Sequence, residues 1–238
     1  MLSVNHIDVY YGDIQVIHDL SFTVEKGEIY SLFGRNGAGK TTTLKSCVNL
    51  VKSTAGNITF DEKDITHMEP YEICSLGVGF TFQERCVFPM LSVKEHFSLV
   101  DTNTFGTKNV KAICSEAIDI FPDLAPLLDR NAAALSGGEA QMLKLAMVFV
   151  RRPLPRLLLL DEPSTGLSPE NVIHLSNKLC ALKSKTTILI VEQVIGAAIG
   201  ITDHYAVIRD GVIVHQDKVG DIKKEEEIVQ KYILGHEE

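Results

Sequence analysis

The sequence lacks any apolar run long enough to cross a membrane as a helix. Such a helix needs about 18 consecutive apolar residues. The nearest candidate, residues 194–201, is eight residues long and half of it is Gly and Ala. The first residues also lack a basic segment followed by an apolar core, so we expect no signal peptide. Any membrane role is therefore expected to be peripheral and mediated by other proteins.

The sequence also lacks paired cysteines and an excess of basic residues. Its five cysteines are scattered and form no CxxC pair, which is typical of reduced thiols in a cytosolic protein. The 23 Lys and Arg against 31 Asp and Glu give a formal net charge of −8. Since a nucleic-acid groove needs clustered basic residues, we expect no nucleic-acid partner. The eight histidines are dispersed without metal-ligand spacing and predict no metal site of their own.

The remaining composition is that of a globular chain with a full core. The 238 residues are 45% hydrophobic and 23% charged, enough for one large domain or two modest lobes. Apolar runs predict buried strands at residues 29–33, 77–82, 156–160 and 186–191, with helices between them. Strands that alternate with helices predict an α/β fold with a mainly parallel sheet covered on both faces.

Other elements frame this predicted core. Residues 1–33 predict three strands, and the Asp210-Gly211 pair within residues 207–214 predicts a tight hairpin. Residues 90–150 predict a mostly helical region punctuated by prolines. A short amphipathic helix is predicted near residues 228–233.

A glycine-rich stretch between a predicted strand and a predicted helix is the strongest functional signal. It places Gly, four residues, Gly, Lys and Thr in the order of a phosphate-binding loop. The glycines let backbone N–H groups converge on anionic oxygen, and the helix start adds partial positive charge. Lys40 is expected to reach the β- and γ-phosphates, and the Thr41 hydroxyl to bind Mg²⁺. The expected nucleotide-binding residues of this stretch are Gly34, Arg35, Asn36, Gly37, Ala38, Gly39, Lys40, Thr41 and Thr42.

Two acidic residues end the leucine-rich strand further along the chain. Ligands of open α/β sheets bind at the carboxyl ends of strands, and Asp161 and Glu162 lie at such an end. Asp161 is expected to hold Mg²⁺, directly or through water, and Glu162 to polarise an attacking water. Acidic residues that merely end a strand are the alternative, which the preceding leucines and the following proline disfavour.

A second anion-binding helix start is predicted at Ser136, Gly137, Gly138 and Glu139. One γ-phosphate does not need two anion-binding helix starts from a single chain. We therefore expect this segment to serve a nucleotide held by another copy or a partner.

An aromatic pair, Tyr10 and Tyr11, is predicted in the loop after the first strand. An aromatic ring there could stack on a base, and simple packing is the alternative. We expect Tyr11 to stack on the adenine of ATP.

These motifs together resemble those of the ATP-binding subunit of an ABC transporter, over essentially the whole chain. They are Gly34 to Thr41 (Walker A), Gln83 (Q-loop), Leu135 to Glu139 (signature) and Leu157 to Glu162 (Walker B). Walker A is shared by many phosphate-loop proteins, but the signature between Walker A and Walker B at these distances is close to diagnostic.

The resemblance implies a single ATP-binding domain over residues 1–238 with ATP and Mg²⁺ as cofactors. Its P-loop RecA-like core, with an N-terminal antiparallel β element, would comprise residues 1–84 and 151–238. Residues 85–150 would form a helical subdomain with the signature motif. Two such chains would close head to tail, with each ATP between Walker A of one and the signature of the other.

The resemblance also implies residue roles and partners. Gln83 would join Thr41 and Asp161 around Mg²⁺, and Gln83 and Gln193 would sense the γ-phosphate. The chain would work in the cytoplasm, peripheral on the inner face of the cell membrane, and would touch the membrane only through transmembrane permease subunits. The loop of Phe88, Pro89 and Met90 is the expected permease contact, with packing inside the helical lobe as the alternative.

Within the family the chain most resembles the shorter ATPase of branched-chain (hydrophobic) amino acid importers. The segments that point there are Tyr11-Gly12, Val87-Phe88-Pro89, Ser136 to Glu139, Gly166 to Pro169, Val191-Glu192-Gln193 and Tyr232 to Gly235. Importers of urea and short amides are the close alternative. A soluble ABC ATPase, for example one assisting iron–sulfur assembly, is the rival of another class. The second ATPase chain could be a copy of this one or a sister, and the resemblance favours the sister.

The chain departs from the family pattern at several positions. Gln193 stands where most members carry His, and it cannot carry charge or shuttle a proton. Ser168 stands at an Asp position, and Ala140 and Met147 replace polar residues of the signature helix; Met147 is expected to weaken a polar anchor. Gln83, where close relatives carry Glu, favours activity. A nucleotide-binding partner with weak hydrolysis therefore stays an alternative.

Overall fold

The computed structural model describes residues 1–81, 87–100 and 110–235, which form two compact units. The first unit comprises residues 1–80, 155–162 and 182–238, and the second comprises residues 81–154 and 163–181. The boundaries implied for the core and the helical subdomain stay a prediction.

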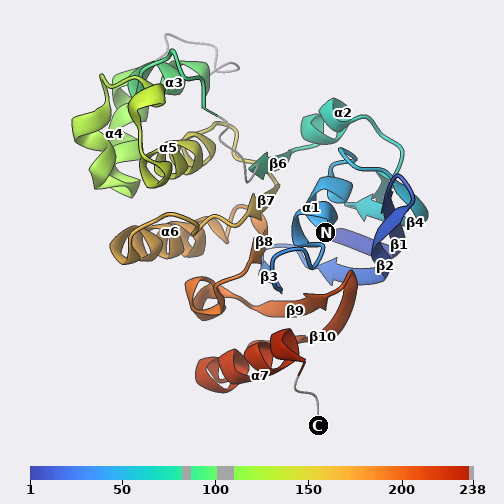
Figure 1. Ribbon diagram of the computed structural model, residues 1–238. Coiled ribbons are helices and arrows are strands. Elements are labelled where there is room, and N and C mark those ends of the chain that lie inside the picture. The colour runs from blue at the N-terminus through green and yellow to red at the C-terminus, as the bar shows by residue number, and fades with distance from the viewer. Residues whose placement is uncertain (82–86, 101–109, 236–238) are drawn as a thin grey trace. The chain divides into compact units, whose positions relative to one another are not determined.

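The first unit contains an antiparallel four-stranded sheet in the order β2-β1-β4-β5 (Figure 1). Its strands are β1 (Leu2–Tyr11), β2 (Ile14–Val24), β4 (Ser53–Phe60) and β5 (Lys63–Asp64). Buried residues alternate along β1 up to Val4 and resume at Ile7, one residue out of phase. A register shift between Val4 and Ile7, where His6 adopts a φ of 51°, returns Ile7 to the buried face.

A six-stranded sheet in the order β10-β9-β3-β8-β7-β6 forms the rest of the core. Its strands are β3 (Ile29–Phe33), β6 (Val78–Thr81), β7 (Leu157–Asp161), β8 (Thr187–Glu192), β9 (His204–Arg209) and β10 (Val212–Lys218). β3 pairs in parallel with β8 and β9, and β7 pairs in parallel with β8. Every residue of β3, β7 and β8 is buried, as expected for parallel strands covered on both faces. The predicted mainly parallel α/β fold is confirmed.

The predicted hairpin is the antiparallel pair β9–β10. Asp210 and Gly211 form its turn with φ angles of 48° and 78°, both in the left-handed region. Two left-handed residues match the twist of the flanking strands, which explains the Asp-Gly sequence.

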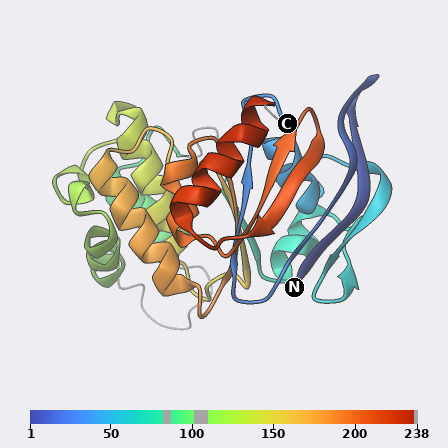
Figure 2. The same cartoon turned by 90° about the horizontal axis from the view of Figure 1, so that it is seen from below.

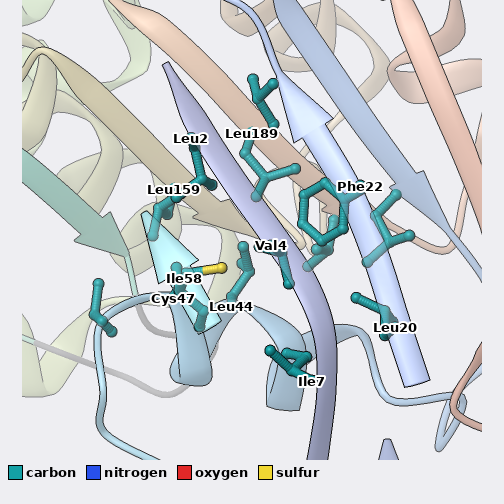
Figure 3. Packing of buried hydrophobic residues seen from close by; sticks show 14 of the residues in the cluster. Leu2, Val4, Ile7, Leu20, Phe22, Leu44, Cys47, Ile58, Leu159 and Leu189 are labelled. Carbon is teal, nitrogen blue, oxygen red and sulfur yellow. The ribbon is translucent and has the colours of Figure 1, made fainter. Parts of the chain in front are cut away.

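Helix α1 (Lys40–Cys47) contacts β1 and β2 of one sheet and β7 and β8 of the other. Its Leu44 and Cys47 pack with Leu2 and Val4 of β1, and with Leu159 of β7, in one buried cluster (Figure 3). The two sheets therefore share a single apolar core around α1. The short helix α2 (Pro70–Ser75) contributes Ile73 to the same cluster.

Helix α7 (Ile222–Leu234) packs on β9 with the 3₁₀ turns η3 (Ile195–Ala197) and η4 (Ile199–Ile201) (Figure 2). Its Val229 packs in a separate cluster with Phe33, Tyr205 and Val207. α7 starts earlier than the predicted short helix because the Asp221 carboxylate caps its N-terminus, accepting from the N–H groups of Lys223 and Lys224.

The second unit is helical, as the sequence predicts. It contains α3 (Val93–Val100), α4 (Val110–Ile120), η1 (Pro122–Leu127), η2 (Ala132–Ala134), α5 (Gly137–Phe149) and α6 (Pro169–Leu182). In α6, Leu175 and Leu179 are buried, whereas Val172, one turn earlier, is half-buried. Within the described part of the chain, no helix is both long and apolar enough to span a bilayer.

The structure corrects the predicted position of Tyr10 and Tyr11. They do not lie in a loop: they end β1, where Tyr11 pairs with Ile14. The turn needs only Gly12 and Asp13, because a two-residue turn suffices to join antiparallel strands.

The cysteines give a test of the packing. Cys47 and Cys114 are buried, and burial raises the pKa of the Cys47 thiol to about 12, whereas Cys74 and Cys180 are exposed. We expect iodoacetamide at pH 7.5 to label Cys47 and Cys114 at least about tenfold more slowly than Cys74 and Cys180. Site-resolved mass spectrometry measures the rates. The difference should vanish in 8 M urea, and fast labelling of native Cys47 would contradict the shared core.

Candidate functional site

The phosphate-binding loop leaves the carboxyl end of β3 and enters α1. Gly37 and Gly39 adopt φ angles of 81° and 107°, which only glycine tolerates at low cost. A Cβ on Gly39 would lie 2.6 Å from the Ile17 Cδ1 atom, so a side chain here would also have to displace the end of Ile17. Arg35 and Asn36 are exposed at the tip of the loop, whereas Ala38 and Thr42 are buried.

Lys40 folds back over its own loop. Its Nζ donates to the carbonyl oxygens of Gly34 at 2.9 Å and Arg35 at 3.1 Å. The same Nζ lies 3.3 Å from Glu162 Oε1, and the lysine is 4% exposed. A buried ammonium held this way is a fixed positive charge beside the loop.

Thr41 and Asp161 meet at the edge of the sheet. The Thr41 Oγ1 donates to Asp161 Oδ1 at 3.0 Å, although 120 residues separate them. Burial raises the pKa of Asp161, which is 1% exposed, while the hydrogen bond from Thr41 lowers it. A hydroxyl beside a carboxylate is the oxygen donor set that Mg²⁺ prefers, so these residues fit the ion. Gln83, the third expected ligand, lies outside the described residues.

Glu162 follows Asp161 in an unusual backbone conformation. Its φ of 44° is in the left-handed region, which is uncommon for a residue other than glycine. Its N–H donates to the Val191 carbonyl at 3.0 Å, and this bond to β8 fixes the turn that directs its carboxylate to Lys40. Strain of this kind gathers at functional sites.

The carboxyl end of β8 completes this edge. Gln193 is exposed there, next to Glu192, which pairs in register with Phe33 of β3. Glu192 is fully buried, and its carbonyl accepts from the N–H of Gly34 at 3.4 Å. We did not predict a role for Glu192 from the sequence. The sequence feature that could have indicated it is a carboxylate at the end of a buried strand, the same feature that marks Asp161.

The Tyr11 side chain is 47% exposed, and the described residues show no hydrogen bond or ring contact between it and the phosphate-binding loop. The neighbouring Tyr10 is engaged, because its hydroxyl donates to Gln15 at 2.7 Å.

In the second unit, the Ser136 segment forms a helix start. The Ser136 Oγ accepts from the N–H of Glu139 at 3.3 Å, and Glu139 Oε2 accepts from the N–H of Ser136 at 2.6 Å. This capping box lowers the pKa of Glu139 through the backbone bond and then the side-chain bond from Ser136. A Cβ on Gly137 would meet no atom within 4 Å, whereas one on Gly138 would lie 2.4 Å from the Gly166 carbonyl oxygen.

The departures from the family pattern have structural counterparts in the second unit. The Ser168 hydroxyl accepts from the backbone N–H of Asn171 at 3.3 Å and from its side-chain amide at 3.0 Å, so Ser168 caps α6. Ala140 is buried, and its neighbour Gln141 donates to the Pro163 carbonyl at 2.9 Å. α5 therefore keeps a polar anchor at Gln141, and Met147 stays half-buried.

One further contact holds the phosphate-binding loop and was missed from the sequence. The N–H of Gly211, in the β9–β10 turn, donates to the Ala38 carbonyl at 3.0 Å. The carbonyl of Gly211 accepts from the N–H of His18 in β2, also at 3.0 Å. The sequence showed a hairpin turn here, but no local signal says what a turn will touch.

Many known proteins are similar to this chain in sequence or in structure. The family model described as ABC transporter matches residues 17–165. The chain is 30% identical to the high-affinity branched-chain amino acid transport ATP-binding protein BraG of Pseudomonas aeruginosa, covering 99% of this chain and 100% of the relative. It is also 30% identical to a probable branched-chain amino acid transport ATP-binding protein, LivF, of Archaeoglobus fulgidus, covering 99% of both. An ATP-binding cassette solved in its ADP conformation is 26% identical, with a TM-score of 0.77 and 98% of each chain covered.

The two neighbouring glycines of α5 give a matched test of this geometry. Gly138→Ala should lower the free energy of unfolding by about 1–3 kcal/mol, because its Cβ collides with a backbone carbonyl. Gly137→Ala should leave it unchanged or raise it by up to about 1 kcal/mol, because the space is open and alanine favours helix. Urea unfolding measures both. Equal destabilisation by the two changes would contradict the packing of Gly138 on Gly166.

Proposed function

This chain belongs to the ABC transporter family and is an ATP-hydrolysing subunit of that family; on that basis we propose that it powers an importer of branched-chain or other hydrophobic amino acids. The observation that carries the ATPase site is the meeting of Lys40 with Glu162, and of Thr41 with Asp161, beside the glycine loop. The solute rests on the names of the full-length relatives, BraG and LivF. Urea and short amides stay the alternative solutes.

The phosphates of ATP would lie in the loop of residues 34–39 at the start of α1. Backbone N–H groups and the partial positive charge of the helix start would bind them. Lys40 would exchange its bonds to the loop carbonyls for the β- and γ-phosphates, and Tyr11 would stack on adenine. Thr41 and Asp161, with Gln83, would hold Mg²⁺, which neutralises charge on the phosphates when bound.

Glu162 would orient the attacking water. Its carboxylate is buried at the strand end and its backbone is fixed by β8, so its direction is preset. Gln193, at the end of β8, would donate a hydrogen bond to the γ-phosphate, and Gln83 would sense the same group. Positioning and charge stabilisation supply most of the catalysis in phosphoryl transfer, and this arrangement serves both.

A second ATPase chain would complete each site. Ser136, Gly137 and Gly138 start α5, and the space around Gly137 is open. The capping box uses the Ser136 oxygen as an acceptor, and the Ser136 O–H, which now bonds the Glu139 carboxylate, would turn to the nucleotide. This helix start would contact the nucleotide held by the partner chain, and Glu139 would stabilise the helix start through the capping box.

The membrane partner would dock on the loop of Phe88, Pro89 and Met90. Phe88 and Met90 are 57% and 82% exposed. Their loop is anchored by His96, which is fully buried: its Nε2 accepts from the N–H of Phe88 at 2.9 Å, and its Nδ1 lies 2.7 Å from the Ser92 carbonyl. An anchored loop with exposed apolar side chains suits a permease contact, which would hold the chain on the cytoplasmic face of the membrane.

The catalytic proposal is tested by Glu162→Gln. We expect the ATPase kcat to fall at least about 100-fold, because the amide cannot polarise water, while the Kd for MgATP stays within about threefold. Steady-state hydrolysis and equilibrium binding of a fluorescent ATP analogue measure the two. Lys40→Ala is the contrasting variant and should weaken nucleotide binding itself. Hydrolysis by Glu162→Gln within tenfold of wild type would remove Glu162 from this role.

The transport proposal is tested by affinity capture from detergent-solubilised membranes of the host. The wild-type chain should recover multi-span permeases and a second ATPase chain, identified by mass spectrometry. Phe88→Ser with Met90→Ser should recover at least about tenfold less permease. The control pair is Tyr71→Ser with Ile173→Ser, which removes equally exposed apolar side chains elsewhere and should capture normally. Soluble scaffold proteins as the sole partners would contradict an importer.

A further inference from the structure

The first unit contains a cavity at the end of β3 that is opposite to the phosphate-binding loop. Tyr30, the second residue of β3, lines it, whereas the loop follows Phe33 at the other end of the strand. The cavity has a volume of about 620 Å³, which is within the range of small-molecule sites.

Two edge strands bound this cavity. β2 ends one sheet and β10 ends the other (Figure 1). They are joined near the hairpin turn, where the N–H of His18 donates to the Gly211 carbonyl. The cavity lies between their other ends, at Ser21 to Thr23 of β2 and Gln216 to Lys218 of β10. It is therefore built by the way the two sheets meet around one core.

The floor of the cavity carries a polar group that the fold does not use. Tyr30 is 4% exposed, and its ring stacks on Phe22 with centroids 5.5 Å apart. Its hydroxyl has no hydrogen-bond partner among the described residues, and it is not one of the fully enclosed polar atoms, so it reaches the open space of the cavity. Burial, and then the nearby Glu28 carboxylate, raise the pKa of Tyr30 far above its usual value. The hydroxyl therefore stays protonated and can both donate and accept.

The walls of the cavity are acidic. Glu28 is buried beside Tyr30: its Oε1 accepts from the N–H of Glu25 at 2.6 Å, and its Oε2 lies 2.7 Å from His204 Nδ1. The carboxylates of Glu25 and Asp217 stand on the exposed rim, opposed by one lysine, Lys218. The lining therefore carries three carboxylates against Lys218 and His204, the histidine that pairs with Glu28, and this excess of acidic groups attracts cations.

We propose that this cavity binds a small organic cation, a primary ammonium group on a short apolar body. The ammonium would donate to the Glu28 carboxylate and the Tyr30 hydroxyl, and the apolar body would lie on the Phe22 ring. Among the described residues no three His, Cys, Asp or Glu side chains converge as a metal site. This site is separate from the ATPase site, and the inference does not depend on the proposed function.

The test uses n-butylammonium as the probe and the full chain labelled with ¹⁵N. Titration should give saturable amide shifts at Glu25, Tyr30 and His204. Tyr30→Phe should raise the Kd at least about fivefold, the effect of losing one hydrogen bond, and Glu28→Gln at least about tenfold. Because the Tyr30 hydroxyl makes no bond within the fold, Tyr30→Phe should keep the wild-type Tm, which separates binding from folding.

Two controls make the outcome decisive. Glu227→Gln removes an equal charge from the exposed surface of α7 and should leave the Kd unchanged. Neutral 1-butanol should bind at least about tenfold more weakly. Equal Kd values for wild type and Tyr30→Phe would overturn the proposal. So would shifts spread over the acidic surface and lost in Glu227→Gln, or equal binding of butanol.

Discussion

Lys40 is the group on which the rest of the proposed nucleotide site depends. Its ammonium is buried, and a buried charge costs several kcal/mol unless neighbours compensate it. Here two loop carbonyls and the Glu162 carboxylate supply that compensation. The same three contacts fix the path of the glycine loop and the direction of Glu162. The Lys40 ammonium thus links the glycine loop to Glu162 at the end of β7.

The parallel sheet makes this convergence possible. The register sets Phe33 against Glu192, and Asp161 against Val191, so three strands end at one level. Thr41, just after β3, and Asp161, at the end of β7, therefore meet at this edge of the sheet. Glu162, which follows β7, has a left-handed backbone that is held by its bond to β8. A residue held in this way at the edge of a sheet has a fixed orientation.

Local signals predicted much of the fold and the loop. The strands before Gly34 and before Asp161, and the Asp-Gly hairpin, depend on apolar runs and turn residues that are read within a few positions. The contacts missed are those between distant residues: Gly211 with Ala38, Glu192 with Gly34, and Glu28 with His204. Tyr11 was misplaced because two residues sufficed for the turn that follows it. Sequence periodicity fixes which face of an element is buried, but not which partner meets it there.

The turn at Asp210 and Gly211 restricts how this family member can change in length. Hairpin tips are usually where insertions and deletions accumulate, because their peptide groups face water. Here both peptide groups of Gly211 are used, one by β2 and one by the nucleotide loop. A Cβ at this position would also lie 2.1 Å from the Val16 carbonyl oxygen. An insertion at this tip would therefore disturb both β2 and the glycine loop. Changes in loop length, like engineered tags or fusions, must be accommodated elsewhere on the surface.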